Sequence, residues 1–303
     1  MKVLFAYDGS VCAETAIDDL HKAGFPEKTR IVVLTIDEDW SLPRSGPDVT
    51  ENIDRRKEYL ARARRAAARM RWFHQDWEID IEVDKGSPAA GIIEKASQLE
   101  ADLIVLGSHG RGSPVGVIFG SVAQKVLQGA PCSVRIARGH YVVPDCPVHL
   151  IIGVDGSKIP DEAVKVVSTR KWPKGTEVRV VNSMVKAMPA AAGLMHTPFT
   201  NSIMRKNVRV SSTRETIEPA LTKLKSAGLK TSFIAKDEEI EQLLCSEAES
   251  WRTDCIFVES RGTDRLDYSN VFAEVAASAY CSVEVIRTSA VEIDTIGTDI
   301  RLS

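Results

Sequence analysis

The feature that most constrains this chain is an internal repeat, because two stretches of its sequence return in the same order. Residues 2–10, KVLFAYDGS, return as residues 149–157, HLIIGVDGS, and both stretches end in Asp-Gly-Ser. Residues 131–136, PCSVRI, return as residues 280–285, YCSVEV. Two such matches in the same order indicate that one structural unit occurs twice in the chain. The length of 303 residues fits two domains of ordinary size.

Within each copy, short apolar runs alternate with longer helical patterns. This alternation is typical of βαβ units and a parallel sheet. Runs such as DLIVLG are apolar on both faces, as strands covered by helices on both sides are. The predicted fold class is α/β, with two tandem Rossmann-like domains that each hold a five-stranded parallel sheet flanked by helices. We expect strands over residues 2–7, 31–36, 78–83, 102–106 and 132–137 in the first copy, and over 149–154, 177–182, 230–235, 254–258 and 281–286 in the second.

Local signals mark domain boundaries and helix starts. The predicted domains are residues 1–140 and 148–287, joined by a linker at 138–147 (RGHYVVPDCP) and followed by a tail at 288–303. Ser10 precedes the first predicted helix, Ser87-Pro88 opens the third, and the acidic residues 237–239 open its counterpart in the second copy. Capping side chains and a proline in the first turn are typical of helix N-termini.

Composition excludes several classes of protein. The net charge of -3, with 44% hydrophobic and 27% charged residues, lacks the basic excess of a dedicated nucleic-acid binder. The first apolar stretch stops at Tyr7, too early for a signal sequence or a membrane span. We therefore expect a cytoplasmic protein with no transmembrane segment and no nucleic-acid partner.

The cysteines and histidines predict no metal site and no disulfide framework. The cysteines form no CxxC pair and the histidines show no ligand spacing; the cysteines are Cys12, Cys132, Cys146, Cys245, Cys255 and Cys281. Cys12 is expected in the first turn of a helix, where the dipole favours a thiolate and permits a redox role. The alternative is a small packed residue, because cysteine is often buried.

A glycine motif follows the fourth predicted strand of the first copy. In GSHGRGSPVGVIFGS, two residues separate Gly107 from Gly110, and nine more precede Gly120-Ser121. Glycines let backbone amides approach a ligand without a Cβ atom in the way. A helix that begins at Gly120-Ser121 directs unpaired N–H groups and its dipole at an anion. The pattern matches neither the P-loop nor the GxGxxG dinucleotide motif.

This strand, glycine loop and helix, together with the Asp-Gly-Ser turn at the end of the first strand, resemble the ATP-binding universal stress proteins. The resemblance covers essentially the whole chain, once per copy. It implies the strand order 3-2-1-4-5 in each domain and ATP with Mg²⁺ as the ligand. Ligands of such sheets lie at the carboxyl ends of the strands.

The resemblance also assigns site residues. Asp8 and the end of the second strand near Ile36 would meet adenine, and Gly107 would approach the ribose. The phosphates would be cradled by Gly110, Gly120, Ser121 and Val122. His109 is either a contact of the phosphates or of a metal-bound water, or a simple turn residue. Arg111 is either a cation beside the phosphates or a solvated side chain.

The second copy departs from the motif. Glu259 stands at the position of Gly107, and Gly262 at that of Gly110. Ser269-Asn270 takes the place of Gly120-Ser121 after a shorter loop. A glutamate adds bulk and negative charge where a polyphosphate would approach. We expect no ATP binding of this kind in the second copy, although Asp155 leaves a smaller ligand open.

Two crossover segments carry their own signals. Residues 183–213 hold four of the six methionines, which suggests either a partner or lipid contact, or an irregular crossover packed on its own domain. In the first copy, Leu60, Ala63, Ala67 and Met70 recur at helical spacing with arginines on the other face. That face is either solvated or binds an anionic surface.

The predicted function is an ATP-binding stress-response regulator that acts on an unidentified protein partner. The resemblance implies pairing through the last strands, residues 132–137 and 281–286, as an internal pseudo-dimer or in a homodimer. One alternative is a slow ATP hydrolase. His109 is the only evident base in the motif and no acidic pair lies beside it, so no catalytic residue is assigned. The other is a nucleotide-independent protein or lipid interaction module that uses the Met-rich segment.

Overall fold

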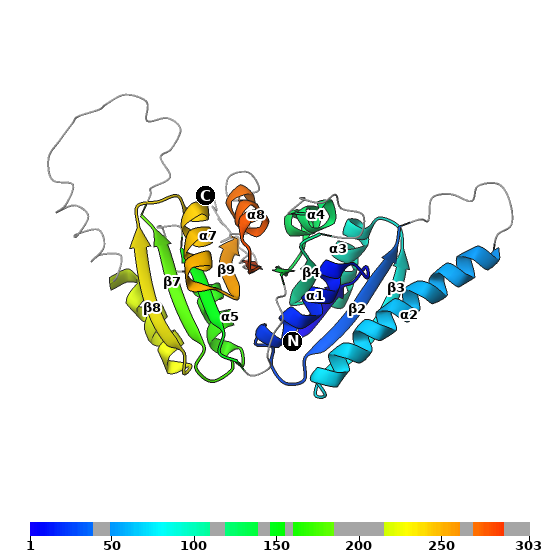
Figure 1. Ribbon diagram of the computed structural model, residues 1–303, viewed down its shortest axis with the longest axis horizontal. Coiled ribbons are helices and arrows are strands. Elements are labelled where there is room, and N and C mark those ends of the chain that lie inside the picture. Colours follow the sequence, from blue (N-terminus) through cyan, green and yellow to red (C-terminus); the bar gives the residue numbers. More distant parts are fainter. Residues whose placement is uncertain are drawn as a thin grey trace, which may run out of the picture.

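The strands of both copies join into one twisted sheet. The computed structural model describes residues 1–38, 49–109, 119–138, 146–154, 160–184, 215–260 and 269–287. The ten strands of these residues run in the order β3-β2-β1-β4-β5-β10-β9-β6-β7-β8. Each half is therefore a parallel sheet of order 3-2-1-4-5, which confirms the predicted fold class (Figure 1).

The elements of the first half follow the predicted strands closely. Its strands are β1 (Lys2–Ala6), β2 (Arg30–Asp37), β3 (Glu78–Lys85), β4 (Leu103–Gly107) and β5 (Ser133–Ala137). Its helices are α1 (Val11–Asp19), the 3₁₀ turn η1 (Leu20–Lys22), α2 (Val49–Phe73), α3 (Pro88–Leu99) and α4 (Ser121–Gly129). Every strand begins and ends within two residues of its expected bounds. A run apolar on both faces, such as β4, fits a strand buried between two layers, whereas the edge strand β3 alternates apolar with charged residues.

The second half repeats this arrangement. Its strands are β6 (His149–Val154), β7 (Glu177–Ser183), β8 (Lys230–Lys236), β9 (Cys255–Ser260) and β10 (Ser282–Arg287). Its helices are α5 (Asp161–Thr169), a helix through residues 215–226, α7 (Ile240–Trp251) and α8 (Ser269–Ser278). α7 begins directly after the acidic residues 237–239 that were predicted to open it, and Glu239 is its N-cap residue, although the Glu239 side chain makes no capping bond.

The helices form two layers, one on each face of the sheet. On one face α1 and α2 pack over the first half, and α5 with the helix through 215–226 packs over the second. On the other face α3, α4, α7 and α8 share a single apolar core that runs through both halves. The buried stripe of α2 includes Ala63, Ala67 and Met70, as its helical spacing predicted.

The two halves meet where β5 and β10 pair antiparallel. These are the segments predicted to pair, and they do so within one chain. Arg135 lies directly opposite Glu284 in this pair. Arg138 donates to the Ala276 carbonyl in the last turn of α8 and to the Cys281 carbonyl beyond it, and Arg287 donates to the Leu127 carbonyl of α4. The seam therefore has approximate two-fold symmetry, broken by the opposite charges of Arg135 and Glu284.

Those two charges belong to a buried chain of ions. Arg135 is fully buried, and its guanidinium lies 2.6 Å from the Asp19 carboxylate and 3.0 Å from that of Glu284. Arg170 donates to both carboxylate oxygens of Glu284, over 2.8 Å to the oxygen that also accepts from Arg135. Burial alone would lower the pKa of Arg135, but the charges of Asp19 and Glu284 outweigh it and hold the pKa above its ordinary range. The chain Asp19–Arg135–Glu284–Arg170 thus alternates in sign across the seam.

Several sequence predictions fall on residues outside the described ranges. These are most of the linker at 138–147, nearly all of the Met-rich segment 183–213, the tail 288–303, Asp155 and Gly262. None of the helices in the described part of the chain is both long and apolar enough to cross a membrane.

Candidate functional site

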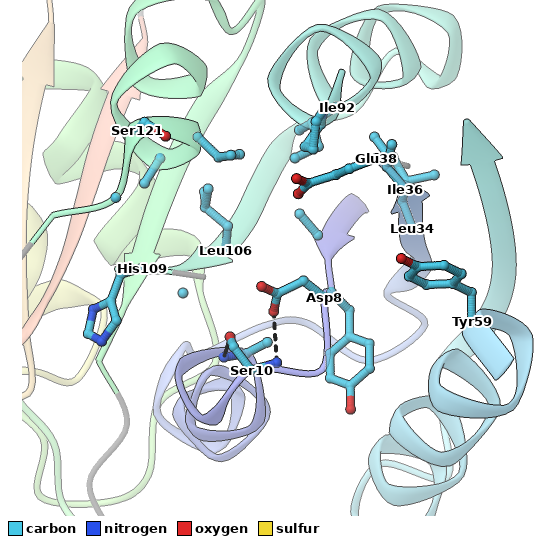
Figure 2. A pocket seen from close by; sticks show the side chains of 18 residues that line it. Asp8, Ser10, Leu34, Ile36, Glu38, Tyr59, Ile92, Leu106, His109 and Ser121 are labelled. Carbon is cyan, nitrogen blue, oxygen red and sulfur yellow. Dashed lines mark hydrogen bonds between the residues drawn. The ribbon is translucent and has the colours of Figure 1, made fainter. Parts of the chain in front are cut away.

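The first strand ends in a turn that fixes an aspartate at the carboxyl edge of the sheet. Gly9 has a φ of 75°, a left-handed conformation that glycine adopts without strain. The Asp8 carboxylate accepts the Ser10 N–H over 2.9 Å, and the Ser10 hydroxyl accepts the Ala13 N–H over 3.1 Å (Figure 2). Ser10 is therefore the N-cap that the sequence predicted, and the turn holds Asp8 beside the start of α1.

The glycine loop is closed at its base. The Gly120 N–H donates to the Ser108 carbonyl over 2.8 Å, which brings the start of α4 back to the end of β4. A Cβ atom on Gly107 would lie 2.8 Å from the Cys12 carbonyl carbon, and one on Gly120 would lie 3.0 Å from the His109 Cα. Gly107 is thus required by the close approach of the protein's own backbone, and a side chain at Gly120 would press on that of His109. Gly110 and Arg111 lie outside the described residues.

A cavity of about 520 Å³ opens at this edge. That volume is typical of small-molecule sites. The cavity brings together all the predicted site residues that the structure describes, namely Asp8, Ile36, Gly107, His109, Gly120, Ser121 and Val122. Figure 2 shows Ser121 and His109 on one side of the cavity, and Ile36 and Tyr59 on the other.

The end of the cavity beside α4 presents a bare helix N-terminus. Gly120 is the N-cap of α4 and has no side chain to cap it. The first N–H groups of a helix have no partner within the helix, and they favour an anion. Ser121 and Val122, the first two residues of α4, both line the cavity. This end is suited to a phosphate.

The opposite end is apolar with an acidic rim. Its apolar walls come from two elements, β2 with Leu34 and Ile36, and α3 with Ile92. The carboxylates of Asp8 and Glu38 face this space in Figure 2. Carboxylates accept hydrogen bonds from amino and hydroxyl groups. This end is therefore suited to a flat apolar ring that carries such donors.

Tyr7 extends this wall toward α1. Its hydroxyl donates to the Glu14 carboxylate. Burial, and then that hydrogen bond and the charge of Glu14, raise the pKa of Tyr7 above its ordinary value. Tyr7 therefore stays a neutral donor at physiological pH.

Sequence reasoning missed part of this site. Glu38 and Tyr59 line the cavity, but neither belongs to a recognisable motif. Glu38 directly follows β2, so its place at the carboxyl edge was a usable signal. Tyr59 comes from the long crossover helix α2, and only the folded chain brings that helix to the edge (Figure 2).

His109 has protein partners on both ring nitrogens. Its Nε2 lies 3.1 Å from the Cys12 Sγ, and its Nδ1 lies 3.1 Å from the Ser108 Oγ. Neither sequence interpretation of His109 included these contacts. The ring joins the first turn of α1 to the glycine loop.

The corresponding place in the second half holds a carboxylate. Glu259, which replaces Gly107, accepts the N–H groups of Glu162 and Ala163 in the first turn of α5, over 3.2 Å and 3.4 Å. A side chain of the protein thus supplies the negative charge that this helix N-terminus favours. The corresponding helix of the first half is α1, and there the Ser10 hydroxyl caps the N-terminus instead.

These features define a class: a doubly wound α/β protein, built twice, with a ligand-sized pocket at the carboxyl edge of its first sheet. Sequence comparison is more specific. A profile of the universal stress protein family matches residues 1–138. A universal stress protein of Thermus aquaticus is 31% identical over 136 residues, which cover 45% of this chain and 97% of that protein. The chain belongs to the universal stress protein family.

Two further comparisons concern proteins of similar or greater length. A universal stress protein of Mycolicibacterium smegmatis is 32% identical over 142 residues, 46% of each chain. The chain thus spans about half of that relative. The crystal structure of a universal stress protein from Archaeoglobus fulgidus superposes with a TM-score of 0.63 at 18% identity, covering 95% of this chain and 97% of that one. This second likeness shows that the tandem fold is shared.

Proposed function

We propose that the first half of this protein binds ATP with Mg²⁺ in the cavity at the carboxyl edge of its sheet. The observation that carries the proposal is the polarity of the cavity. One end is a helix N-terminus without a side-chain cap, and the other is apolar with two carboxylates. A phosphate chain suits the first end and an adenine ring suits the second.

The roles of the residues follow from their places. The aliphatic side chains of Ile36 and Ile92 would pack against adenine, and the carboxylates of Asp8 and Glu38 would accept from its amino group or the ribose hydroxyls. The amides of Ser121 and Val122 would donate to the phosphates. The cavity has no lysine or arginine among its described lining residues. A divalent cation would therefore supply the positive charge that the phosphates need.

The second half is proposed to lack this activity. Glu259 stands at the position of Gly107 and accepts the amides at the start of α5. Its negative charge opposes the phosphates of a nucleotide at this edge of the sheet. We propose the predicted domains, 1–140 and 148–287, as one binding unit and one non-binding unit. Occupancy of the first would regulate a protein partner to the extent that bound and empty forms differ in affinity for it.

One nucleotide per chain is the expected result for the purified protein. The protein is denatured, the released nucleotide is measured by anion-exchange chromatography, and the emptied protein is titrated with MgATP in a calorimeter. Glu259→Gly tests the cause in the second half. If the carboxylate alone blocks binding there, this variant should bind more than one nucleotide per chain, and if the shorter loop also prevents binding, it should still bind one. Two nucleotides in the parent would contradict the assignment of the second half, and none would contradict the proposed function.

A further inference from the structure

Cys12 and His109 form a thiol–imidazole pair at the edge of the cavity, in which His109 lines the cavity and Cys12 does not. Cys12 comes from the first turn of α1, whereas His109 follows β4. The Cys12 Sγ lies 3.1 Å from the His109 Nε2 and 3.9 Å from the Ser108 Oγ. The Ser108 Oγ in turn lies 3.1 Å from the His109 Nδ1. The three side chains thus form a closed ring of polar contacts.

The ring satisfies every contact with the thiol proton on Sγ, and it still does so after that proton moves to the His109 Nε2. If the thiol proton moves to Nε2, the imidazolium donates Nε2–H to the thiolate and Nδ1–H to the Ser108 oxygen. The Ser108 hydroxyl then donates its own proton to the thiolate. The N-terminus of α1 adds a favourable dipole. A nucleophile beside a base that a third group orients is the general arrangement of an activated thiol.

The remaining cysteines are less suited to this chemistry. Burial raises the pKa of Cys132 to about 11 and that of Cys281 to about 12. Burial likewise raises the pKa values of Cys245 and Cys255. Cys12 is partly exposed, and Cys146 is exposed. Cys146 therefore serves as an internal reference for an accessible thiol.

We propose that Cys12 is a modifiable thiol, activated by His109, that reacts with peroxides and other small electrophiles. With hydrogen peroxide, the thiolate attacks one oxygen, so that an S–O bond forms and the O–O bond breaks. The leaving hydroxide takes the Nε2 proton of His109 and departs as water. Sulfur is oxidised by two electrons and the peroxide is reduced, which leaves Cys12 as a sulfenic acid.

The pair is placed to affect the cavity. His109 lines the cavity, and Gly107 packs directly on the Cys12 backbone. The His109 Cα also lies against Gly120, at the start of α4. Modification of Cys12 would break its contact with the His109 imidazole. His109 would then move from its place between Gly107 and Gly120. This coupling rests on the proposed function, whereas the reactivity of the thiol does not.

Competitive alkylation tests the reactivity. The full chain is treated with limiting iodoacetamide at pH 7, and each cysteine peptide is quantified by mass spectrometry over time. An ordinary thiol is only a few per cent ionised at this pH, so Cys12 should react at least about tenfold faster than Cys146. His109→Gln should remove that advantage, and Ser108→Ala should reduce it less. Peroxide followed by dimedone should label Cys12 first.

The outcomes separate this inference from the proposed function. Equal rates for Cys12 and Cys146, or an unchanged Cys12 rate in both variants, would overturn it. Calorimetry with MgATP then tests the coupling, with peroxide expected to weaken ATP binding in the parent but not in Cys12→Ser. Parent protein that binds no ATP before oxidation would contradict the proposed function and leave the alkylation result standing.

Discussion

Replacing Arg135 by alanine is expected to lower the free energy of unfolding by about 3–5 kcal/mol, because the change strips a buried ion chain of its central cation. Asp19 and Glu284 would keep their negative charges out of water, and Glu284 would have only Arg170 beside it. A carboxylate without its partner in a buried site carries the full cost of desolvation. The loss should exceed that of any exposed ion pair in the molecule.

Urea unfolding followed by far-UV circular dichroism and by tryptophan fluorescence measures this loss. Arg30→Ala is the matched control, because Arg30 also pairs with a carboxylate across two strands but is exposed, and exposed pairs contribute little. Glu284→Ala completes a double-mutant cycle. The combined variant should lose less stability than the sum of the single variants. Additive losses, or equal losses for Arg135→Ala and Arg30→Ala, would show that the seam does not depend on the ion chain.

The ion chain also explains why unlike halves meet. The two seam strands are repeats of one sequence, and Ser133 and Ser282 bond the opposite strand in the same way. The charge differs only at the central pair, where Arg135 faces Glu284. Two first halves joined through β5 would place arginine opposite arginine, and like charges directly opposite are destabilising. Asp19 pairs with the arginine of β5 and Arg170 pairs with the glutamate of β10. The charges of the seam therefore favour pairing of the two unlike halves within one chain.

The fold could be predicted from sequence because its signals are local. A strand such as β4 is covered on both faces, so each of its residues is apolar, and DLIVLG needs no knowledge of its neighbours. The repeat then predicted that both halves have the same order of strands and helices. The start of α7 was also marked locally, because the acidic residues 237–239 directly precede the helix and Glu239 is its N-cap residue.

The candidate site was predicted only where one stretch of chain builds it. Asp8, Gly107 and Gly120 lie in turns whose backbone conformation is specified by neighbouring residues in the sequence. Glu38 and Tyr59 reach the cavity through tertiary packing, which no motif records. The ion chain left one usable signal, namely an arginine inside an apolar strand with a glutamate at its repeat position. The sequence gives no comparable signal that Asp19 and Arg170 belong to the ion chain.

Gly120→Asp is expected to weaken MgATP binding by at least about a hundredfold. The new carboxylate would stand at the N-terminus of α4 and accept the amides proposed for the phosphates, as Glu259 does at α5. Losing two charge-assisted hydrogen bonds of about 1.5 kcal/mol each corresponds to a factor of this size. Its Cβ would also press on the His109 Cα, 3.0 Å away. Aspartate is a good N-cap, so α4 should stay folded.

Calorimetric titration with MgATP measures the affinity, and thermal unfolding checks that the variant is folded. Gly120→Ala separates the two effects, because it adds the Cβ without the charge and should cost less. Ser269→Asp is the matched control, since it introduces the same carboxylate at the start of α8, and it should leave the affinity unchanged. If Gly120→Asp bound MgATP as the parent does, the nucleotide would lie elsewhere. Unchanged partner binding in a nucleotide-free Gly120→Asp protein would favour the interaction module over the ATP-dependent regulator.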